Sequence, residues 1–496
     1  MNNIRKTSFN EIFIFFLIFI SFLFFLDFQS FFFLKPRSFH FIRQTDTLSF
    51  VSYYLLNGVN FFDTGNLNLY NNTGKAVCEF PGLYYITALI TYFGFESYKV
   101  LKIVHLVIFF FSSFILYKYL RQQFNFINSL SIVFLLFSST VILYYSINYI
   151  PNFPALCFSI CGVVYFFIFL ENNIQNKLIT SLLFFLFACL LKITFAIYPI
   201  TCFLMLFYRF FKQKKIDYKI VFLFSGLFVI LIVWNLYVIH YNKINNSEYY
   251  LTNIKPIWNA NSNEFDEVFS FILNYWTYKY YYPSTIHVFI ITVFISLFFY
   301  KKINKFHFIF ILFSFIGVIS YFVLFFKQFR DHDYYFMEFV PFFLIVFIAT
   351  YNAIIESVPV KIAITISIVL LVITVLSINY AKLNIQRRYD KPFEQVSYLA
   401  KELENIESKI DSIGIPKYAK ILVIPDNTMN GSLYYLNRFG YTVGDTASQN
   451  LVAFYKKSDY ILITDSSVLQ NIKSKFGLKK SILKYRGVGL YKIKPY

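Results

Sequence analysis

The run "KLITSLLFFLFACLLKITFAIYPITCFLMLFYR" (residues 177–209) decides how the chain crosses a membrane. It is apolar over nearly its whole length, but it exceeds the roughly 20 residues with which one helix spans a bilayer. Lys192 interrupts the run near its middle. The run can form one tilted span, or two short spans that turn at Lys192. The choice sets the side of the membrane on which every later segment lies.

The composition is that of a membrane protein. Hydrophobic residues make up 58% of the chain and charged residues only 14%, whereas soluble domains carry roughly 25% charged residues. We therefore expect a polytopic α-helical membrane protein, whose first apolar run is an uncleaved span because no small-residue cleavage site follows it. The other apolar runs lie near residues 11–34, 98–120, 127–146, 152–171, 218–241, 284–300, 305–327, 333–354 and 358–380.

Basic residues, which give a net charge of +19, set the orientation where they fall in short loops. Arg5 and Lys6 place the N-terminus in the cytoplasm, and 209–219 and 301–305 are the richest short basic segments. Only two spans within 177–209 put both of these loops in the cytoplasm as well. We therefore expect about 11 spans in an inner or plasma membrane, with the C-terminus on the non-cytoplasmic face.

Two classes of function are not expected. Nucleic-acid binding is disfavoured because no aromatic stacking platform is interleaved with a basic groove. The chain has five cysteines, most of them in apolar runs, and no CxxC spacing. The sequence therefore indicates neither a disulfide framework nor a cysteine metal site.

The chain divides into two domains. Residues 1–383 form the membrane domain, whose outer loop 35–97 carries two candidate catalytic acids. Residues 384–496 indicate a small extracytoplasmic α/β domain, because strand-like and helix-like segments alternate there. Within it we expect strands at 419–426 and 459–466, helices at 390–411, 431–440 and 468–476, and a closing hairpin that turns near Gly487.

Candidate site residues fall on the predicted non-cytoplasmic face. Asp46 lies in the polar run "RQTDT", Glu79 in "CEFPGLYYI" and Lys192 at the predicted turn. Each has a structural alternative, because acids stabilise helix N-termini and a lysine can extend its ammonium to the membrane boundary. The segment "RDHDYYFMEFVP" (330–341) is harder to explain structurally, because it opens a span with several ionisable groups.

The order of these segments resembles that of the membrane C-class glycosyltransferases. The likeness is to the branch of the dolichyl-phosphate-mannose protein mannosyltransferases and the lipid A aminoarabinose transferase (glycosyltransferase family 39). It covers roughly residues 1–380, and some members carry a soluble tail. The segments that carry it are the acid after the first span, "EFPGLYY" (79–85), the proline-rich "SINYIPNFPAL" (146–156), "LLKIT" (190–194) and "HDYY" (332–335).

The resemblance implies a polyprenyl-phosphate-linked sugar as donor and a lipid, glycan or protein hydroxyl as acceptor. It assigns Asp46 and Glu79 as the catalytic residues, although many members have a second acid where this chain has Thr47. Some relatives place a lysine where this chain has Phe80, so other side chains must contact the donor phosphate and the substrate. The candidates are Lys192, Arg330, His332, Asp333, Tyr334 and Tyr335, with Arg43 and Asn152 as further candidates; relatives often have aspartate in place of Asn152.

This chemistry is consistent with the residue types. The Asp46 carboxylate can accept the proton of an acceptor hydroxyl while the sugar gains oxocarbenium character, and a single displacement inverts the anomeric carbon. The leaving phosphate is already charged, so cations rather than a general acid should assist its departure. No cofactor is expected, and a divalent metal is compatible with the sequence but not required.

Two other functions use similar features. A transporter or flippase of anionic lipid-linked substrates would use the same boundary charges, but it should show paired broken helices in its two halves. A structural subunit of a membrane complex is the third reading. In the glycosyltransferase reading we expect chemistry in the membrane domain, while the soluble domain covers the outer cavity or guides the acceptor. Asp426 and Asp465 end its predicted strands, where a doubly wound fold would place a ligand site, but both are more simply explained as turn residues.

Overall fold

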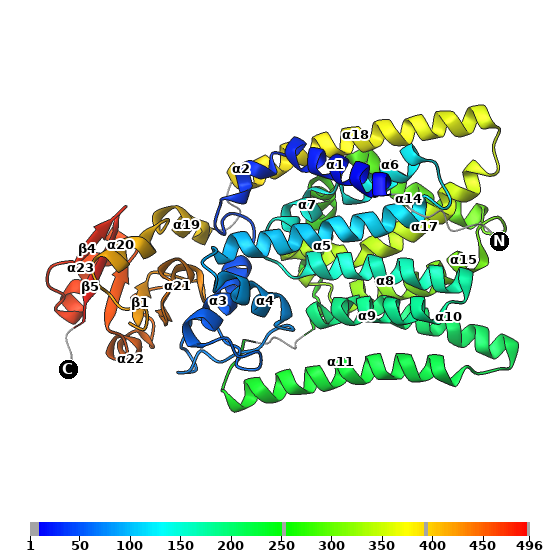
Figure 1. Ribbon diagram of the computed structural model, residues 1–496. Helices are drawn as coiled ribbons and strands as arrows, with labels where there is room; N and C mark the ends of the chain where they lie inside the picture. The colour runs from blue at the N-terminus through cyan, green and yellow to red at the C-terminus, as the bar shows by residue number, and fades with distance from the viewer. Residues whose placement is uncertain (1–8, 250–253, 391–394, 494–496) are drawn as a thin grey trace.

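The computed structural model describes residues 9–249, 254–390 and 395–493. Long helices form one part of the molecule, and a small soluble domain with a five-stranded sheet forms the other, as Figure 1 shows. Between them lie α3 (Phe41–Asn57) and α4 (Gly82–Thr91). The predicted multi-pass helical membrane protein with a small C-terminal α/β domain is therefore confirmed.

The described membrane part is built from helices. Within the described residues, seven helical segments are long and apolar enough to cross a membrane, and nine if each of two sharply bent pairs counts as one span. Three further apolar helices are shorter, so the total of about 11 spans stays a prediction. The helices are α1 (Phe9–Phe25), α2 (Phe28–Phe32), α5 (Ser97–Leu120), α6 (Phe126–Phe137), α7 (Thr140–Ser146), α8 (Asn152–Asn172), α9 (Gln175–Leu191), η1 (Ile193–Ala196), α10 (Ile197–Gln213), α11 (Tyr218–Ile244), η2 (Ile257–Asn259), α12 (Ser262–Phe271), η3 (Ile272–Trp276), α13 (Thr277–Tyr280), α14 (Pro283–Phe298), α15 (Lys305–Leu324), α16 (Gln328–Asp331), η4 (Asp333–Phe339), α17 (Val340–Ile355) and α18 (Val360–Asp390).

The apolar run 177–209 forms two helices that break at Lys192, as the orientation argument predicts. α9 ends at Leu191, Lys192 takes an extended conformation (φ −152°), and η1 and α10 follow. The Phe80 N–H donates to the Leu190 carbonyl (3.2 Å). The break therefore lies beside the segment that joins α3 to α4.

The region expected as an outer loop, residues 35–97, contains two helices. α3 begins at Phe41 after His40, which occupies its N-cap position with φ 52°, so Asp46 lies in the second helical turn. The alternative that Asp46 caps a helix is therefore wrong. Polar residues of α3 are buried because α4, α5 and the soluble-domain helix α21 (Gly431–Leu436) pack around it.

The soluble domain contains a mixed sheet of order β2-β1-β3-β5-β4. β1 pairs in parallel with β2 and β3, whereas β5 runs antiparallel to β3 and β4. The predicted hairpin is confirmed, because β4 and β5 join at Arg486 and Gly487, which both have positive φ. The remaining elements are β1 (Ile421–Ile424), β2 (Gly440–Thr442), β3 (Tyr460–Ile463), β4 (Leu483–Tyr485), β5 (Val488–Lys492), η5 (Gln395–Ser397), α19 (Tyr398–Glu402), α20 (Ile406–Ser412), α22 (Leu451–Lys456) and α23 (Ser466–Phe476).

Three sequence expectations for this region differ from the structure. α18 continues to Asp390, past the predicted boundary at residue 384. The predicted helix 390–411 is interrupted and includes α19 and α20 as separate short helices, while residues 391–394 lie outside the described part. β2 was not expected, because three residues are too few to give a recognisable alternation.

The soluble domain is attached to the segment between α3 and α4 through the backbone. The Leu69 N–H donates to the Gly440 carbonyl (2.8 Å), and the Gly440 N–H donates to the Leu67 carbonyl (3.1 Å). Asn68 forms a parallel bridge with Gly440. This segment therefore covers the free edge of β2, which would otherwise expose unpaired N–H and C=O groups.

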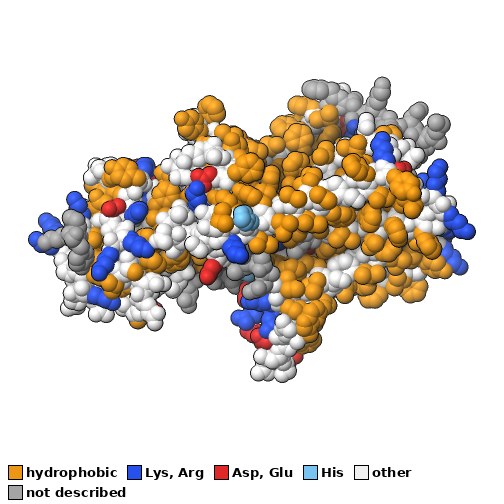
Figure 2. Space-filling model, turned by 90° about the horizontal axis from the view of Figure 1, so that it is seen from below, with side chains coloured by type: hydrophobic (Ala, Val, Ile, Leu, Met, Phe, Trp, Pro, Cys, Tyr) orange, Lys and Arg blue, Asp and Glu red, His pale blue; other side chains and the backbone are white. Residues whose placement is uncertain are grey.

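Basic side chains gather at one end of the helical part (Figure 2). Figure 2 shows an apolar surface over the helices, with Lys and Arg side chains at the tip farthest from the soluble domain. Lys212 and Lys305 lie close enough to interact electrostatically, so the two basic loops 209–219 and 301–305 share this end. The structure thus places both predicted cytoplasmic loops together; the side of the membrane stays a prediction.

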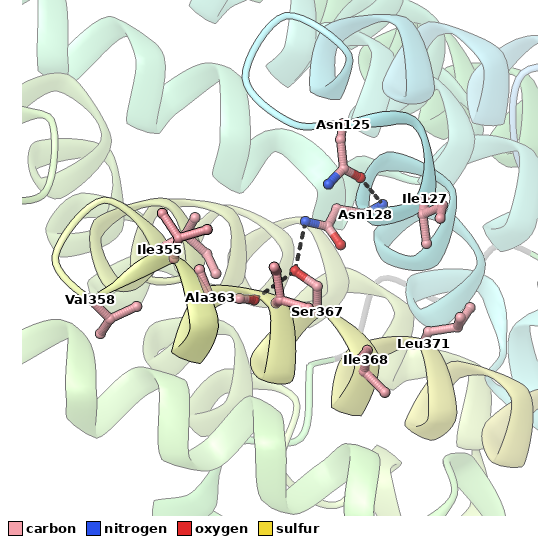
Figure 3. Close-up of a pocket in the computed structure, with 11 residues that line it drawn as sticks. Asn125, Ile127, Asn128, Ile355, Val358, Ala363, Ser367, Ile368 and Leu371 are labelled. Carbon is pink, nitrogen blue, oxygen red and sulfur yellow. Dashed lines mark hydrogen bonds between the residues drawn. The ribbon is translucent and has the colours of Figure 1, made fainter.

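A cavity of about 440 Å³ lies at the same basic end, between the start of α6, the end of α17 and the start of α18. Figure 3 shows its lining, in which Asn128 Nδ2 donates to Ser367 Oγ (3.1 Å). Its other lining residues are mostly aliphatic, and the described lining includes no acid or cation. The candidate site residues lie at the opposite end of these helices.

Candidate active site

Helix α3 presents two charged side chains on one face. Arg43 and Asp46 are three residues apart, which places them on the same side of a helix. The Arg43 guanidinium forms an ion pair with Glu79, and the Tyr84 hydroxyl donates to the same carboxylate. Burial alone would raise the pKa of Glu79, but the neighbouring Arg43 guanidinium holds it below its usual range. Glu79 is therefore a buried anion that fixes Arg43.

Asp46 is buried with a different set of partners. Its side chain is 8% exposed, and its Oδ1 accepts a hydrogen bond from Asn430 Nδ2 (2.8 Å). Tyr249, from the segment after α11, lies beside the same carboxylate. Burial raises the pKa of the Asp46 carboxyl, while the Asn430 hydrogen bond and the Arg43 charge act against that rise. Within the described residues, no ion pair involves Asp46.

Lys192 reaches the same region from the break between α9 and η1. Its ammonium lies 4.6 Å from the centre of the Tyr335 ring. Arg43, Glu79 and Glu338 are near enough to act on its charge. Among the described residues it has no hydrogen-bond acceptor or ion-pair partner. The sequence prediction that Lys192 turns toward the other candidate residues is therefore in accord with this geometry.

Glu338 lies near Lys192, although it was not among the site residues predicted from the sequence. It is fully buried, and its Oε1 accepts from Thr194 Oγ1 (2.5 Å) and, at 3.5 Å, from Asn152 Nδ2. Its Oε2 is buried without a hydrogen-bond partner in the described part of the chain. Asn152 thus lies beside Glu338 at this site. An acid within an apolar run was the available signal.

The "HDYY" residues form an aromatic group. The His332 ring stacks on Tyr334 (5.3 Å between centres) and on Tyr335 (5.4 Å), with His40 at 5.6 Å. Burial, together with the charges of His40 and Lys192, lowers the pKa of His332 to about 3. His332 is therefore neutral at physiological pH, and it would contact a phosphate by hydrogen bonding rather than by charge.

Asp333 has a different environment from Asp46. It is fully buried and forms an ion pair with Arg388 of α18 (2.6 Å). The Tyr145 hydroxyl donates to its Oδ1 (2.9 Å), and His40 Nε2 lies 3.3 Å from that oxygen. Asp333 therefore connects α3, α7, η4 and α18. Nothing in the spacing of the sequence indicated Arg388 as its partner.

Arg330 does not turn toward this group. Its side chain is 44% exposed and forms ion pairs with Glu267 (3.1 Å) and Asp331 (3.3 Å). The adjacent Lys327 pairs with Glu264 of α12 in the same way. The expectation that Arg330 joins Lys192 and His332 is wrong, because the acids of α12 hold these cations at the surface.

The described residues contain no group of three or more His, Cys, Asp or Glu side chains that could hold a metal ion. The five cysteines are free thiols. Two of the acids, Glu79 and Asp46, are both close enough to Arg43 to feel its charge, and Glu79 forms the ion pair with it.

Comparisons with known proteins bear on the fold. A family model described as dolichyl-phosphate-mannose-protein mannosyltransferase matches residues 79–238. No curated protein sequence matches the chain. The crystal structure of ArnT from Cupriavidus metallidurans bound to undecaprenyl phosphate is similar, with a TM-score of 0.62 and 9% identity over 98% of this chain and 99% of that one. The same protein in the apo state gives a TM-score of 0.61, again at 9% identity, over 96% of this chain and 97% of that one.

The similarity extends over both the helical part and the soluble domain, because nearly the whole of each chain is covered. The family-model match includes Glu79, Asn152 and Lys192, which are three of the predicted site residues. The resemblance noted from the order of the sequence segments is thereby confirmed, and the chain has an ArnT-like fold.

Proposed function

We propose that the chain is a glycosyltransferase that moves a sugar from a polyprenyl-phosphate donor to a hydroxyl acceptor, with Asp46 as the base. The observation that carries the proposal is the environment of Asp46. Its buried carboxylate has no ion-pair partner among the described residues, and it lies on the same face of α3 as the Arg43–Glu79 pair. A similar fold has been crystallised with undecaprenyl phosphate, which supports a lipid-linked donor.

The proposed reaction is one displacement. The acceptor oxygen attacks the anomeric carbon while Asp46 takes the hydroxyl proton, so that an O–H bond breaks as the new C–O bond forms. The bond from the anomeric carbon to the phosphate oxygen breaks at the same time, and the phosphate leaves with the electron pair. Attack opposite the leaving group inverts the configuration at the anomeric carbon.

Lys192 is the proposed contact for the leaving phosphate. Its ammonium has no acceptor among the described residues, and it lies on the ring of Tyr335 within electrostatic range of Glu79 and Glu338. A cation placed where negative charge develops stabilises the transition state. Glu79 acts through Arg43 in this scheme, so it is a positioning residue.

The non-cytoplasmic face is the proposed side of the reaction. The basic loops 209–219 and 301–305 lie together at the end of the helices away from the soluble domain, and such loops favour the cytoplasm. A reporter that is active only in the cytoplasm and is fused after Tyr496 should give no signal. A strong signal would contradict this orientation.

The activity is tested with purified protein in detergent and a panel of polyprenyl-phosphate sugars. We expect transfer to an acceptor hydroxyl from at least one donor, with inverted configuration in the product. Asp46→Asn protein at the same concentration is the control, because it keeps the size of the side chain but removes the base. Equal transfer by both proteins would contradict the role of Asp46.

A further inference from the structure

A short loop of the soluble domain, residues 426–432, is rigidly shaped by one buried acid. Asp426 is 3% exposed, and its Oδ1 accepts from the Thr428 N–H (2.7 Å). Its other oxygen accepts from Ser432. The Gly431 N–H donates to Thr428 Oγ1 (2.8 Å). The prediction that Asp426 is a turn residue is confirmed, and the turn holds Asn430 in a fixed place.

Asn430 projects from this loop into the candidate active site. It is fully buried, its Nδ2 donates to Asp46 Oδ1 (2.8 Å), and its Oδ1 accepts from the Asn68 backbone N–H (3.1 Å). A backbone N–H can only donate, so it identifies the oxygen of the Asn430 amide and thereby the nitrogen that faces Asp46. The hydrogen bond therefore requires an accepting carboxylate oxygen at Asp46.

The loop lies directly against α3. A Cβ atom at Gly431 would come within 2.9 Å of the Phe41 ring and 2.5 Å of Thr428 Oγ1. Asn68 Nδ2 also donates to the Met429 carbonyl (2.7 Å). Packing against Phe41 and the hydrogen bond from Asn68 thus hold the loop against α3. The short side chain of Asn430 reaches Asp46 from this loop.

We propose that Asn430 of the soluble domain is a positioning residue of the active site, which fixes one oxygen of the Asp46 carboxylate and leaves the other oxygen for the acceptor hydroxyl. This inference rests on the proposed role of Asp46 as base. It gives the soluble domain a part in the chemistry in addition to covering the cavity or guiding the acceptor. The domain would need to be docked for Asp46 to be held in its reactive orientation.

The groups that face Asp46 determine how its charge responds to changes at Asn430. They are Arg43 on the same helix, Glu79 before α4, Tyr249 after α11 and Asn430 itself. A hydrogen bond to the ionised form lowers the pKa of a carboxyl group, so removing the amide should raise the pKa of Asp46. Since a base must be ionised, the acidic limb of the pH–rate profile should then move to higher pH.

The decisive variant is Asn430→Asp. It keeps the size of the side chain and the oxygen that accepts from Asn68, but it places a carboxylate oxygen opposite Asp46. We expect the acidic limb of the kcat/KM profile to rise by roughly one pH unit in Asn430→Ala, as for loss of a hydrogen bond to a charged group. The rise should be larger in Asn430→Asp, because like charges disfavour ionisation.

The control is Asn437→Gly, in the same domain. Asn437 Nδ2 donates to Glu407 (2.7 Å), and its φ of 48° suits glycine. This variant loses a hydrogen bond of the domain without touching Asp46, so its pH profile should match that of the wild type. An Asn430→Asp profile that matched the wild type would overturn the inference, because it would mean that the group at position 430 does not act on the charge of Asp46.

A second measurement separates this inference from the proposed function. The double variant Asp46→Asn with Asn430→Asp exchanges donor and acceptor, so it should recover the thermal unfolding temperature that Asn430→Asp alone loses, while transfer stays abolished. Recovery of stability supports the contact even if Asp46→Asn alone proves active and the proposed base is wrong. Absence of any recovery, with wild-type transfer intact and dependent on Asp46, would overturn the inference alone.

Discussion

The two buried carboxylates Asp333 and Asp46 have different partners. Asp333 is closed off by Arg388, Tyr145 and His40, whereas Asp46 receives one amide hydrogen bond and, among the described residues, no ion pair. Asp46 lies in α3, and Asp333 contacts His40 at the N-cap of the same helix. The difference indicates that Asp333 holds helices together, while Asp46 keeps capacity to accept a proton.

The burial of a charged side chain without a counter-ion costs free energy, so folded proteins usually pair a buried charge with an opposite one. Asp333 follows this rule. Asp46 departs from it, and its raised pKa reflects that burial. Such departures are concentrated at functional sites, so the less completely partnered acid is the better candidate for catalysis.

The largest expected effect is on turnover in Asp46→Asn. The amide oxygen can still accept from Asn430, so the fold should remain, but transfer should fall by about 10²- to 10⁴-fold because general-base catalysis is lost. Steady-state transfer by purified protein measures this. Thr47→Val is the matched control, because the Thr47 hydroxyl is buried without a partner in the described structure. Comparable transfer rates in wild type and Asp46→Asn would mean that Asp46, like Asp333, is not the catalytic base.

The second effect is on stability in Asp333→Asn. Arg388 would keep its charge in a buried position without a counter-ion, which costs about 3–5 kcal/mol. We expect a clear drop in the thermal unfolding temperature in detergent. The double variant Asp333→Asn with Arg388→Met removes the stranded charge and should recover part of the loss. If the single variant instead unfolded like the wild type and lost only turnover, Asp333 would belong to the catalytic group.

The sequence predicted a structural feature correctly where the residues of one short segment determine that feature. The break at Lys192 followed from run length and loop charge, and the hairpin at Gly487 followed from local turn chemistry. The helix 41–57 was recognised only in part, as a helix that Asp46 would cap, because the polar run around Asp46 looked like a loop. Those side chains are buried by other parts of the protein rather than exposed to lipid.

Long-range partners could not be predicted from the sequence. Asn430 lies 384 positions from Asp46, and an asparagine before a glycine indicates only a turn. Arg388 was not recognised because the pairing of α18 with η4 depends on the packing of the whole bundle. Arg330 was misplaced because Glu267, which neutralises it, lies in the short helix α12, whose sequence gave no sign that it packs beside Arg330.

The third effect is on donor use in Lys192→Ala. If Lys192 contacts the donor phosphate, losing a hydrogen bond to a charged group should weaken donor binding by roughly 1.5–3 kcal/mol. Titration of the polyprenyl-phosphate donor at matched protein concentration measures the change. Lys192→Arg should retain part of the affinity, because the charge remains. Unaltered donor affinity and rate in Lys192→Ala would show that this ammonium only contacts the Tyr335 ring and the membrane boundary.

The smallest expected effect is in Arg330→Ala. This variant tests whether a cation that is already paired at the surface contributes to donor binding. Arg330 is 44% exposed and already paired with Glu267 and Asp331, and exposed ion pairs contribute about 0.2–1 kcal/mol. We therefore expect the same donor affinity as the wild type and at most a small fall in unfolding temperature. The donor titration used for Lys192→Ala measures the first quantity, so the two cations are compared under one set of conditions. A loss of donor affinity in Arg330→Ala as large as that in Lys192→Ala would mean that Arg330 leaves its acidic partners when the donor binds, and the phosphate site would then extend to the surface beside α12.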